Sequence, residues 1–403
     1  MPSPSSARVA EALELARQRF AEGRLVATVE LLEPIARKGL PASQVAAIDH
    51  LQCVASFRLG QLNDCLRCAR SFLQLVDPGL ESELEHRFSL LAVAVVAAGE
   101  LALYEESLQY LSELLTLSTR FGDLSHYVRA RGTAASAFQL MGDLWAAQRV
   151  LAALSSEFDR PHTEQRLETT MRCNHASLCL LMVRLARDAG ADEAAQQALQ
   201  DAEASVRRAI GTAAELKDLR LVTFVRLHEV ELSMLHGQLD QAQSHLAHAL
   251  QDAQSAGLNA HWRHMQLLEA ELLLARGHAQ QAVEILADLQ AAEHPTNELS
   301  TRVRLRDLQF RSLSALGQPA AALSARQAYD KLNGFRAFRQ ARAQSTLMRT
   351  RLEMEHLFLR RSDGKAFGAG TNEPACLSDS AVPQSVGQAP ISRAIRARRQ
   401  TAR

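Results

Sequence analysis

Residues 261–292 read HWRHMQLLEAELLLARGHAQQAVEILADLQAA, and this stretch decides the fold. Leucines dominate the run before Gly277, and Ala282, Ile285, Leu286 and Leu289 follow it at the spacing of one face of an α-helix. Glycine tolerates the positive φ with which many helices end. The stretch therefore predicts two antiparallel helices joined at Gly277.

This arrangement recurs along the chain, each time as an apolar run, a glycine and a second amphipathic run. Neighbouring glycines lie between 37 residues apart (Gly23 to Gly60) and 48 residues apart (Gly142 to Gly190). Repetition at such a period is typical of helical hairpins stacked into a solenoid. The predicted turn glycines are Gly23, Gly60, Gly99, Gly142, Gly190, Gly237, Gly277 and Gly317.

A small residue stands about five positions into each second run. We expect it to face the first helix, because a short side chain lets two helix axes approach closely and a bulkier one would overpack the pair. These residues are Thr28, Cys65, Ser107, Ala147, Ala195, Ala242, Ala282 and Ala322.

The composition points to an all-α protein without a global charge. The 403 residues are 47% hydrophobic but only 5% aromatic, and 45 Lys and Arg balance 45 Asp and Glu. No net field therefore attracts nucleic acid. The first 20 residues do not resemble a secretory signal, and the longest apolar stretch, residues 90–98, is too short to span a membrane. We expect a cytoplasmic protein with no membrane span and with reduced cysteines.

The repeats resemble tetratricopeptide repeats (TPR) over residues 1–333. Their spacing is similar to that of the longer repeats in the sensor or scaffold region of bacterial signalling proteins such as TPR-containing diguanylate cyclases. The early Trp and closing Pro of shorter repeats are absent, as is the Gly-Gly-Asp/Glu-Glu-Phe signature of the cyclase domain. The resemblance implies an α-solenoid, a right-handed superhelix of about eight hairpins, that binds proteins in its concave groove.

The last two segments differ from the repeats. Residues 334–361 contain Phe338, Ser345, Leu352 and Leu359 at heptad spacing. Two alternatives fit this segment, a capping helix for the solenoid and a coiled coil that forms a homodimer. Residues 362–403 are rich in Gly, Ser and Pro and end in an Arg-rich stretch, which predicts a disordered tail.

No motif predicts catalysis. Cys65 and Cys68 have metal-ligand spacing, but no second cysteine pair accompanies them, so we interpret them as core residues. His228 starts a His-Glu-x-x-Leu sequence and not the His-Glu-x-x-His motif of zinc proteases. We therefore predict no catalytic residue, metal or cofactor.

Candidate binding residues are polar positions in the first helix of each pair, three to thirteen residues before the glycine, because first helices line the concave surface of such solenoids. Arginines there can form paired hydrogen bonds with carboxylates. The candidates are Arg129, Ser136, Gln139, Arg184, Glu231, His264, Glu271, Arg304 and Arg311.

These observations predict a non-catalytic scaffold or sensor that binds a protein or peptide, with bacterial signalling as its setting. One alternative is the regulatory part of a truncated or frameshifted diguanylate cyclase. Another is a regulator that associates with nucleic acid through the basic tail, although that tail has no aromatic residue to stack on bases.

Overall fold

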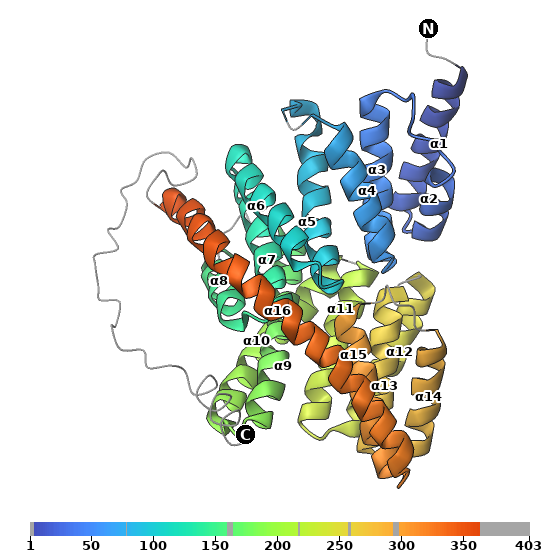
Figure 1. The fold of residues 1–403 in the computed structure, drawn as a ribbon, viewed down its shortest axis with the longest axis vertical. Coiled ribbons are helices and arrows are strands. Elements are labelled where there is room, and N and C mark those ends of the chain that lie inside the picture. The colour runs from blue at the N-terminus through green and yellow to red at the C-terminus, as the bar shows by residue number, and fades with distance from the viewer. Residues whose placement is uncertain are drawn as a thin grey trace.

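The computed structural model describes residues 4–77, 79–158, 164–216, 218–256, 259–292 and 298–362. In this part of the chain there are sixteen α-helices, one 3-10 turn and no strand (Figure 1). Consecutive helices form eight antiparallel hairpins, so the predicted all-α solenoid is confirmed. The elements are α1 (Pro4–Ala21), α2 (Leu25–Leu32), α3 (Ala42–Arg58), α4 (Leu62–Leu75), η1 (Glu81–Glu83), α5 (Leu84–Glu100), α6 (Tyr104–Phe121), α7 (Leu124–Leu140), α8 (Leu144–Phe158), α9 (Gln165–Asp188), α10 (Asp192–Leu216), α11 (Leu219–Leu235), α12 (Leu239–Ala256), α13 (Asn259–Ala275), α14 (Ala279–Ala291), α15 (Leu299–Ala315) and α16 (Pro319–Ser362).

The eight turns share one geometry. Seven of the predicted glycines have φ between +68° and +82°. At Gly277, for example, the glycine N–H donates to the carbonyl of Leu274 (3.0 Å) and the N–H of His278 donates to the carbonyl of Leu273 (2.9 Å). These two bonds satisfy the last carbonyls of the first helix. Each turn is therefore a Schellman-type helix end.

Gly99 is the exception, and its assignment as a turn glycine was wrong. It lies inside α5, and the residue with positive φ in this hairpin is Ala102 (φ +57°). A methyl group on Gly99 would approach Leu140 Cδ1 to 2.7 Å, so this glycine permits close packing of α5 on α7. Ala102 also restores the spacing, because Ser107 follows it by five residues, as the small residue follows the glycine in the other hairpins.

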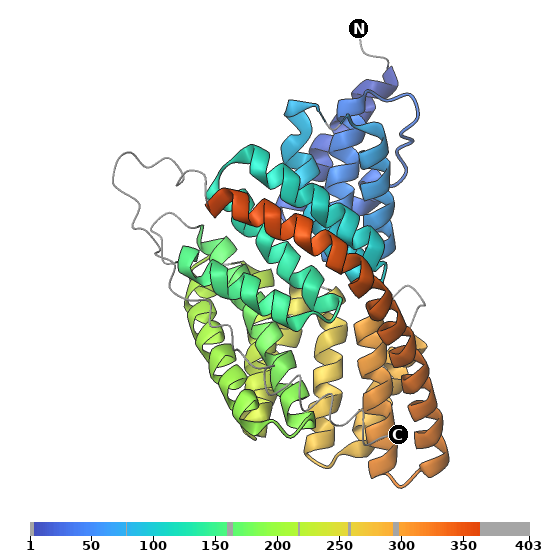
Figure 2. The same cartoon turned by 60° about the vertical axis from the view of Figure 1, so that its left-hand side comes forward.

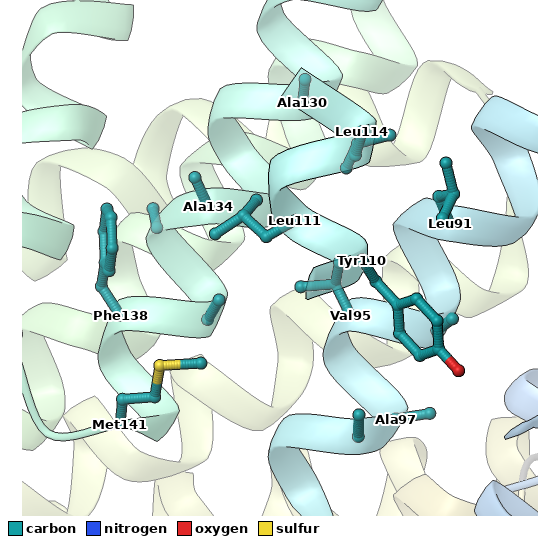
Figure 3. Close-up of a cluster of buried hydrophobic side chains, with 14 of the residues drawn as sticks. Leu91, Val95, Ala97, Tyr110, Leu111, Leu114, Ala130, Ala134, Phe138 and Met141 are labelled. Carbon is teal, nitrogen blue, oxygen red and sulfur yellow. The ribbon is translucent and has the colours of Figure 1, made fainter. Parts of the chain in front are cut away.

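The small residues lie where the two helices of a hairpin meet. All are at most 5% exposed, and Ser107 Oγ donates to the carbonyl of Val95 on the facing helix (2.8 Å). The first helices also pack on one another from α1 to α15, which makes them the inner layer. Figure 3 shows part of the resulting core between α5, α6 and α7, to which Leu91, Leu111 and Phe138 each contribute a buried side chain.

The last hairpin returns to the middle of the array. Leu299 and Val303 of α15 belong to the same hydrophobic core as α5 to α10, and Ser300 Oγ donates to Glu100 Oε2 (3.0 Å). In both views α16 runs alongside α6 (Figure 1, Figure 2). Next to this contact, Gln340 Nε2 of α16 donates to the carbonyl of Leu140, the last residue of α7 (3.0 Å).

The predicted boundary between residues 333 and 334 does not appear as a break, because α16 is one helix of 44 residues. Its later part lies on α6 and on the turn between α7 and α8, so it does not cap the exposed side of the last hairpin. A helix of this length spans about 66 Å at 1.5 Å per residue, which carries it from the eighth hairpin to the third and fourth.

Some predictions fall on other parts of the chain. The Arg-rich tail at residues 363–403 lies outside the described residues. Among the described helices, none combines the length and apolar character that a membrane crossing requires.

Candidate protein-binding site

Six of the nine candidate binding residues form one connected network, which we call the charge network: Arg184, Glu231, His264, Glu271, Arg304 and Arg311. They come from α9, α11, α13 and α15, four successive helices of the inner layer. The pairs His264 and Glu271, and Arg304 and Arg311, are each seven residues apart, so both members lie on the same helix face two turns apart.

Glu231 is the centre of the network. Its Oε2 accepts from Arg184 Nη2 (2.9 Å), and its Oε1 lies 3.2 Å from His264 Nε2 and 4.0 Å from Arg304 Nη1. Arg304 Nη2 continues to Glu271 Oε2 (2.6 Å), and Arg311 Nη1 lies 3.8 Å from Glu271 Oε1. Two carboxylates thus hold three arginines and one histidine.

The middle of the network is withdrawn from water. The side chain of Glu231 is only 7% exposed. Burial alone would raise its pKa, but Arg184, His264 and Arg304 outweigh burial and hold the pKa well below its usual value. Arg304 is affected in the opposite sense: burial lowers its pKa, whereas Glu271 and Glu231 raise it, with a net rise. At neutral pH the central pairs are therefore ionised.

The edge of the network faces solvent. Arg184, His264 and Arg311 are 37%, 38% and 47% exposed. Arg311 reaches its two carboxylate neighbours, Glu271 and Asp307, at 3.8 and 3.7 Å, which is beyond ordinary hydrogen-bond distance. A guanidinium has five N–H donors. Arg184 and Arg311 consequently have donors to offer to a further acceptor.

The other three candidates lie on α7 and do not join this network. Arg129 pairs with Glu85 (3.4 Å), and its guanidinium lies over the ring of Phe88, 4.9 Å from the centroid. Ser136 Oγ donates to the carbonyl of Gly132 in its own helix (3.2 Å). Gln139 is half-buried. The structure therefore divides the nine candidates into a charge network and three separate residues.

Sequence reasoning missed two neighbours of the network. His228 lies one turn before Glu231 and is buried, which lowers its pKa to about 4, so it is neutral at pH 7. Asp307 precedes Arg311 by four residues and pairs with it. The signal available in the sequence was their spacing of three and four residues from a candidate, which places side chains on one helix face.

The two cysteines with metal-ligand spacing do not offer reactive chemistry. Cys65 and Cys68 are buried, and Cys65 Sγ lies 3.4 Å from Cys53 Sγ. Burial raises the pKa of Cys68 to about 12, and a thiol of this kind remains protonated and unreactive. Among the described residues, no group of three His, Cys, Asp or Glu side chains is arranged to hold a metal.

Comparison with known proteins places the fold. No family model matches the sequence, and no curated protein is similar to it. A Rap protein in complex with Competence and Sporulation Factor has a similar structure, with a TM-score of 0.58 and 13% identity over 84% of this chain and 89% of that one. The apo form of RapI aligns with a TM-score of 0.38 and 8% identity over 81% of this chain and 97% of that one. The Cut9–Hcn1 hetero-tetramer gives a TM-score of 0.33 and 12% identity over 79% of this chain and 59% of that one.

The Rap likeness covers most of both chains and concerns a TPR-type helical-repeat protein. Together with the eight hairpins and their shared turn geometry, it shows that this chain is a TPR-like α-solenoid.

Proposed function

We propose that the protein binds a peptide or a protein segment on the inner helix layer, with the charge network as the binding site, and acts as a non-catalytic scaffold or sensor. One observation carries the proposal. Four successive inner helices contribute to a single network. In its buried centre the charges of arginine and glutamate are paired with one another, and its edge presents Arg184, His264 and Arg311 to solvent.

The chemistry of this edge favours a partner with carboxylates. Glu231 and Glu271 restrain the arginines from behind, so less side-chain entropy is lost when a ligand arrives. An arginine held in this way can form charge-assisted hydrogen bonds with a carboxylate side chain or with a C-terminus. An acidic peptide that lies across α9 to α15 would engage both Arg184 and Arg311.

The Rap structure supports the setting of this proposal. That protein, which has the same fold, was captured in complex with Competence and Sporulation Factor. We infer that the present chain likewise responds to a signalling factor, in agreement with the bacterial sensor repeats that its sequence resembles.

Selection from a random peptide library with the purified full chain tests the proposal. We expect the selected peptides to be enriched in Asp and Glu, and to bind an Arg184→Ala/Arg311→Ala variant at least about tenfold more weakly, since a hydrogen bond to a charged group contributes about 1.5–3 kcal/mol. Arg304 is left intact because its side chain is only 19% exposed and it links Glu231 to Glu271 within the network.

The matched control is Arg67→Ala/Arg120→Ala. These two arginines lie on α4 and α6, are 55% and 44% exposed, and each forms an ion pair. This variant should bind the selected peptides as tightly as the wild type. Equal binding by both double variants, or a library without any binder, would contradict the proposed site.

A further inference from the structure

The C-terminal ends of two inner helices in the first half of the array face the N-terminal ends of inner helices in the second half. Glu100, the last residue of α5, accepts a hydrogen bond from Ser300, the second residue of α15 (3.0 Å). In the same way Arg58, the last residue of α3, lies close enough to Arg220, the second residue of α11, for their charges to repel each other. We call this junction the seam.

Three arginines gather at the α3 end of the seam. Arg58 and Arg220 are joined there by Arg166, the second residue of α9, whose Nη2 donates to Asp218 Oδ2 (2.5 Å). The other carboxylate oxygen of Asp218 accepts from the backbone N–H groups of Arg220 and Leu221 (3.0 and 3.3 Å). Three guanidinium groups therefore share one carboxylate, and both of its oxygens already have donors.

Arg58 and Arg220 lack a partner for their charge. Among the described residues neither guanidinium forms a hydrogen bond or an ion pair, although both side chains are partly buried. Burial and the charges of Arg220 and Arg166 lower the pKa of Arg58 to about 10, and Asp218 opposes them only in part. Both groups remain charged at neutral pH, so their repulsion costs free energy that a bound anion would recover.

The cluster is held in place and open to solvent. The guanidinium of Arg58 lies over the ring of Phe20 in α1, 4.8 Å from its centroid, and Arg166 is held by Asp218. Side chains that are restrained before a ligand arrives lose less entropy when it binds. The side chain of Arg166 is 55% exposed, so an anion can approach from this side.

The charge of the cluster indicates the ligand. Asp218 cancels one of the three guanidinium charges, which leaves two positive charges. A phosphate group carries about −1.5 to −2 at pH 7 and has three acceptor oxygens, whereas a single carboxylate would neutralise only half of the excess. Guanidinium groups also match the geometry of phosphate oxygens with paired N–H donors.

We propose that the seam between α3, α9 and α11 binds the phosphate group of a small molecule, with Arg58 and Arg220 as its direct ligands and Arg166 at the rim. A bound phosphate joins the second hairpin to the fifth and sixth. The site is separate from the charge network, because Arg166 and Arg184 are about 27 Å apart along α9 at 1.5 Å per residue.

Isothermal titration calorimetry with the full chain tests the proposal, with inorganic phosphate and glycerol 3-phosphate as probes in a chloride buffer. We expect both probes to bind at pH 7.5, sulfate to compete with them and acetate not to compete. Binding of glycerol 3-phosphate should weaken towards pH 5.5, because the phosphate group takes up its second proton near pH 6. Tighter binding of glycerol 3-phosphate would support a phosphorylated metabolite as the ligand, and tighter binding of inorganic phosphate the free anion.

Two variants test the assigned residues. Arg58→Gln and Arg220→Gln should each bind phosphate at least about tenfold more weakly, since each removes a charge-assisted hydrogen bond. Without phosphate, Arg220→Gln should melt at no lower temperature than the wild type, because it removes a repulsion. Phosphate should raise the melting temperature of the wild type and leave that of this variant unchanged. A lower melting temperature of Arg220→Gln in phosphate-free buffer would contradict the repulsion on which the proposal rests.

Arg326→Gln is the matched control. Arg326 also lies over an aromatic ring, 5.1 Å from the centroid of Tyr329, but it has a carboxylate of its own, Asp330 at 3.1 Å. This variant and Arg184→Ala/Arg311→Ala should both bind phosphate like the wild type, which keeps the test separate from that of peptide binding. A wild type that binds neither probe, or a loss of phosphate binding in either control, would overturn the proposal.

Discussion

Replacement of Glu231 by glutamine should destabilise the protein by about 3 kcal/mol at pH 7. The substitution keeps the shape of the side chain but removes the charge from a site that is 7% exposed and contacts Arg184, His264 and Arg304. Removal of one member of a buried ion pair costs about 3–5 kcal/mol, because the remaining charge stays buried. The lower end applies here, since Arg304 keeps Glu271 and Arg184 is partly solvated.

The loss should depend on pH in a defined direction. The pKa of Glu231 is lowered well below its usual value of 4.5 in the folded state. A depressed carboxyl pKa contributes stability above the unfolded pKa, and this contribution disappears as pH falls through the folded pKa. The difference between wild type and Glu231→Gln should therefore be constant from pH 7 to about pH 5 and decrease at lower pH.

Urea unfolding followed by circular dichroism measures both effects. Glu81→Gln is the matched control, since Glu81 also pairs with an arginine, Arg120 at 2.7 Å, but is 79% exposed. An exposed pair contributes about 0–1 kcal/mol. If Glu231→Gln cost no more than this control, or if its cost were the same at pH 3.5 and pH 7, the network would not be a buried ionic centre.

Three further outcomes follow from the packing. Gly99→Ala should destabilise the protein by about 1–2 kcal/mol, because the added methyl group would overpack against α7. Gly211→Ala should stabilise it by up to about 1 kcal/mol, because Gly211 lies in open space within α10. If thermal unfolding showed equal effects of the two substitutions, the close-packing role of Gly99 would be refuted. Ala147→Leu should cost about 1–3 kcal/mol because Ala147 is fully buried between the helices of its hairpin, and the exposed Ala152→Leu should change stability by less than about 0.5 kcal/mol in the same assay. Burial and a neighbouring carboxylate raise the pKa of Glu100 to about 8, so the folded state retains a proton that the unfolded state releases above pH 4.5. The stability of the wild type should therefore fall from pH 5 to pH 8. A Glu100→Gln variant that shows the same decline in melting temperature would disprove this assignment.

The hairpins were predictable because their signals are local. A glycine that ends a helix, the apolar period on each side of it and a small residue five positions later all act within about 30 residues. Gly99 shows where this reasoning fails. The sequence offers a glycine three positions before the turn, and only the backbone shows that Ala102 adopts positive φ while Gly99 remains helical.

The binding site was predictable in part. Counting back from each glycine placed six polar residues on the inner face of four helices, and these six do meet. The count could not show that Arg129, Ser136 and Gln139 lie apart from them. Nor could it show that Glu231 would be enclosed by three cationic or polar partners, because that depends on how closely α9, α11, α13 and α15 approach one another.

The sequence by itself determined the repeating unit, the number of hairpins and the inner position of the first helices, since short-range periodicity specifies each of these. The tertiary structure alone decided that the array curves far enough for α15 and α16 to return to the third and fourth hairpins. It also decided which face of α16 is buried there and which remains free. The physical reason is that curvature accumulates from small rotations between hairpins, and the contacts it creates join residues about 200 positions apart, such as Gln340 and Leu140.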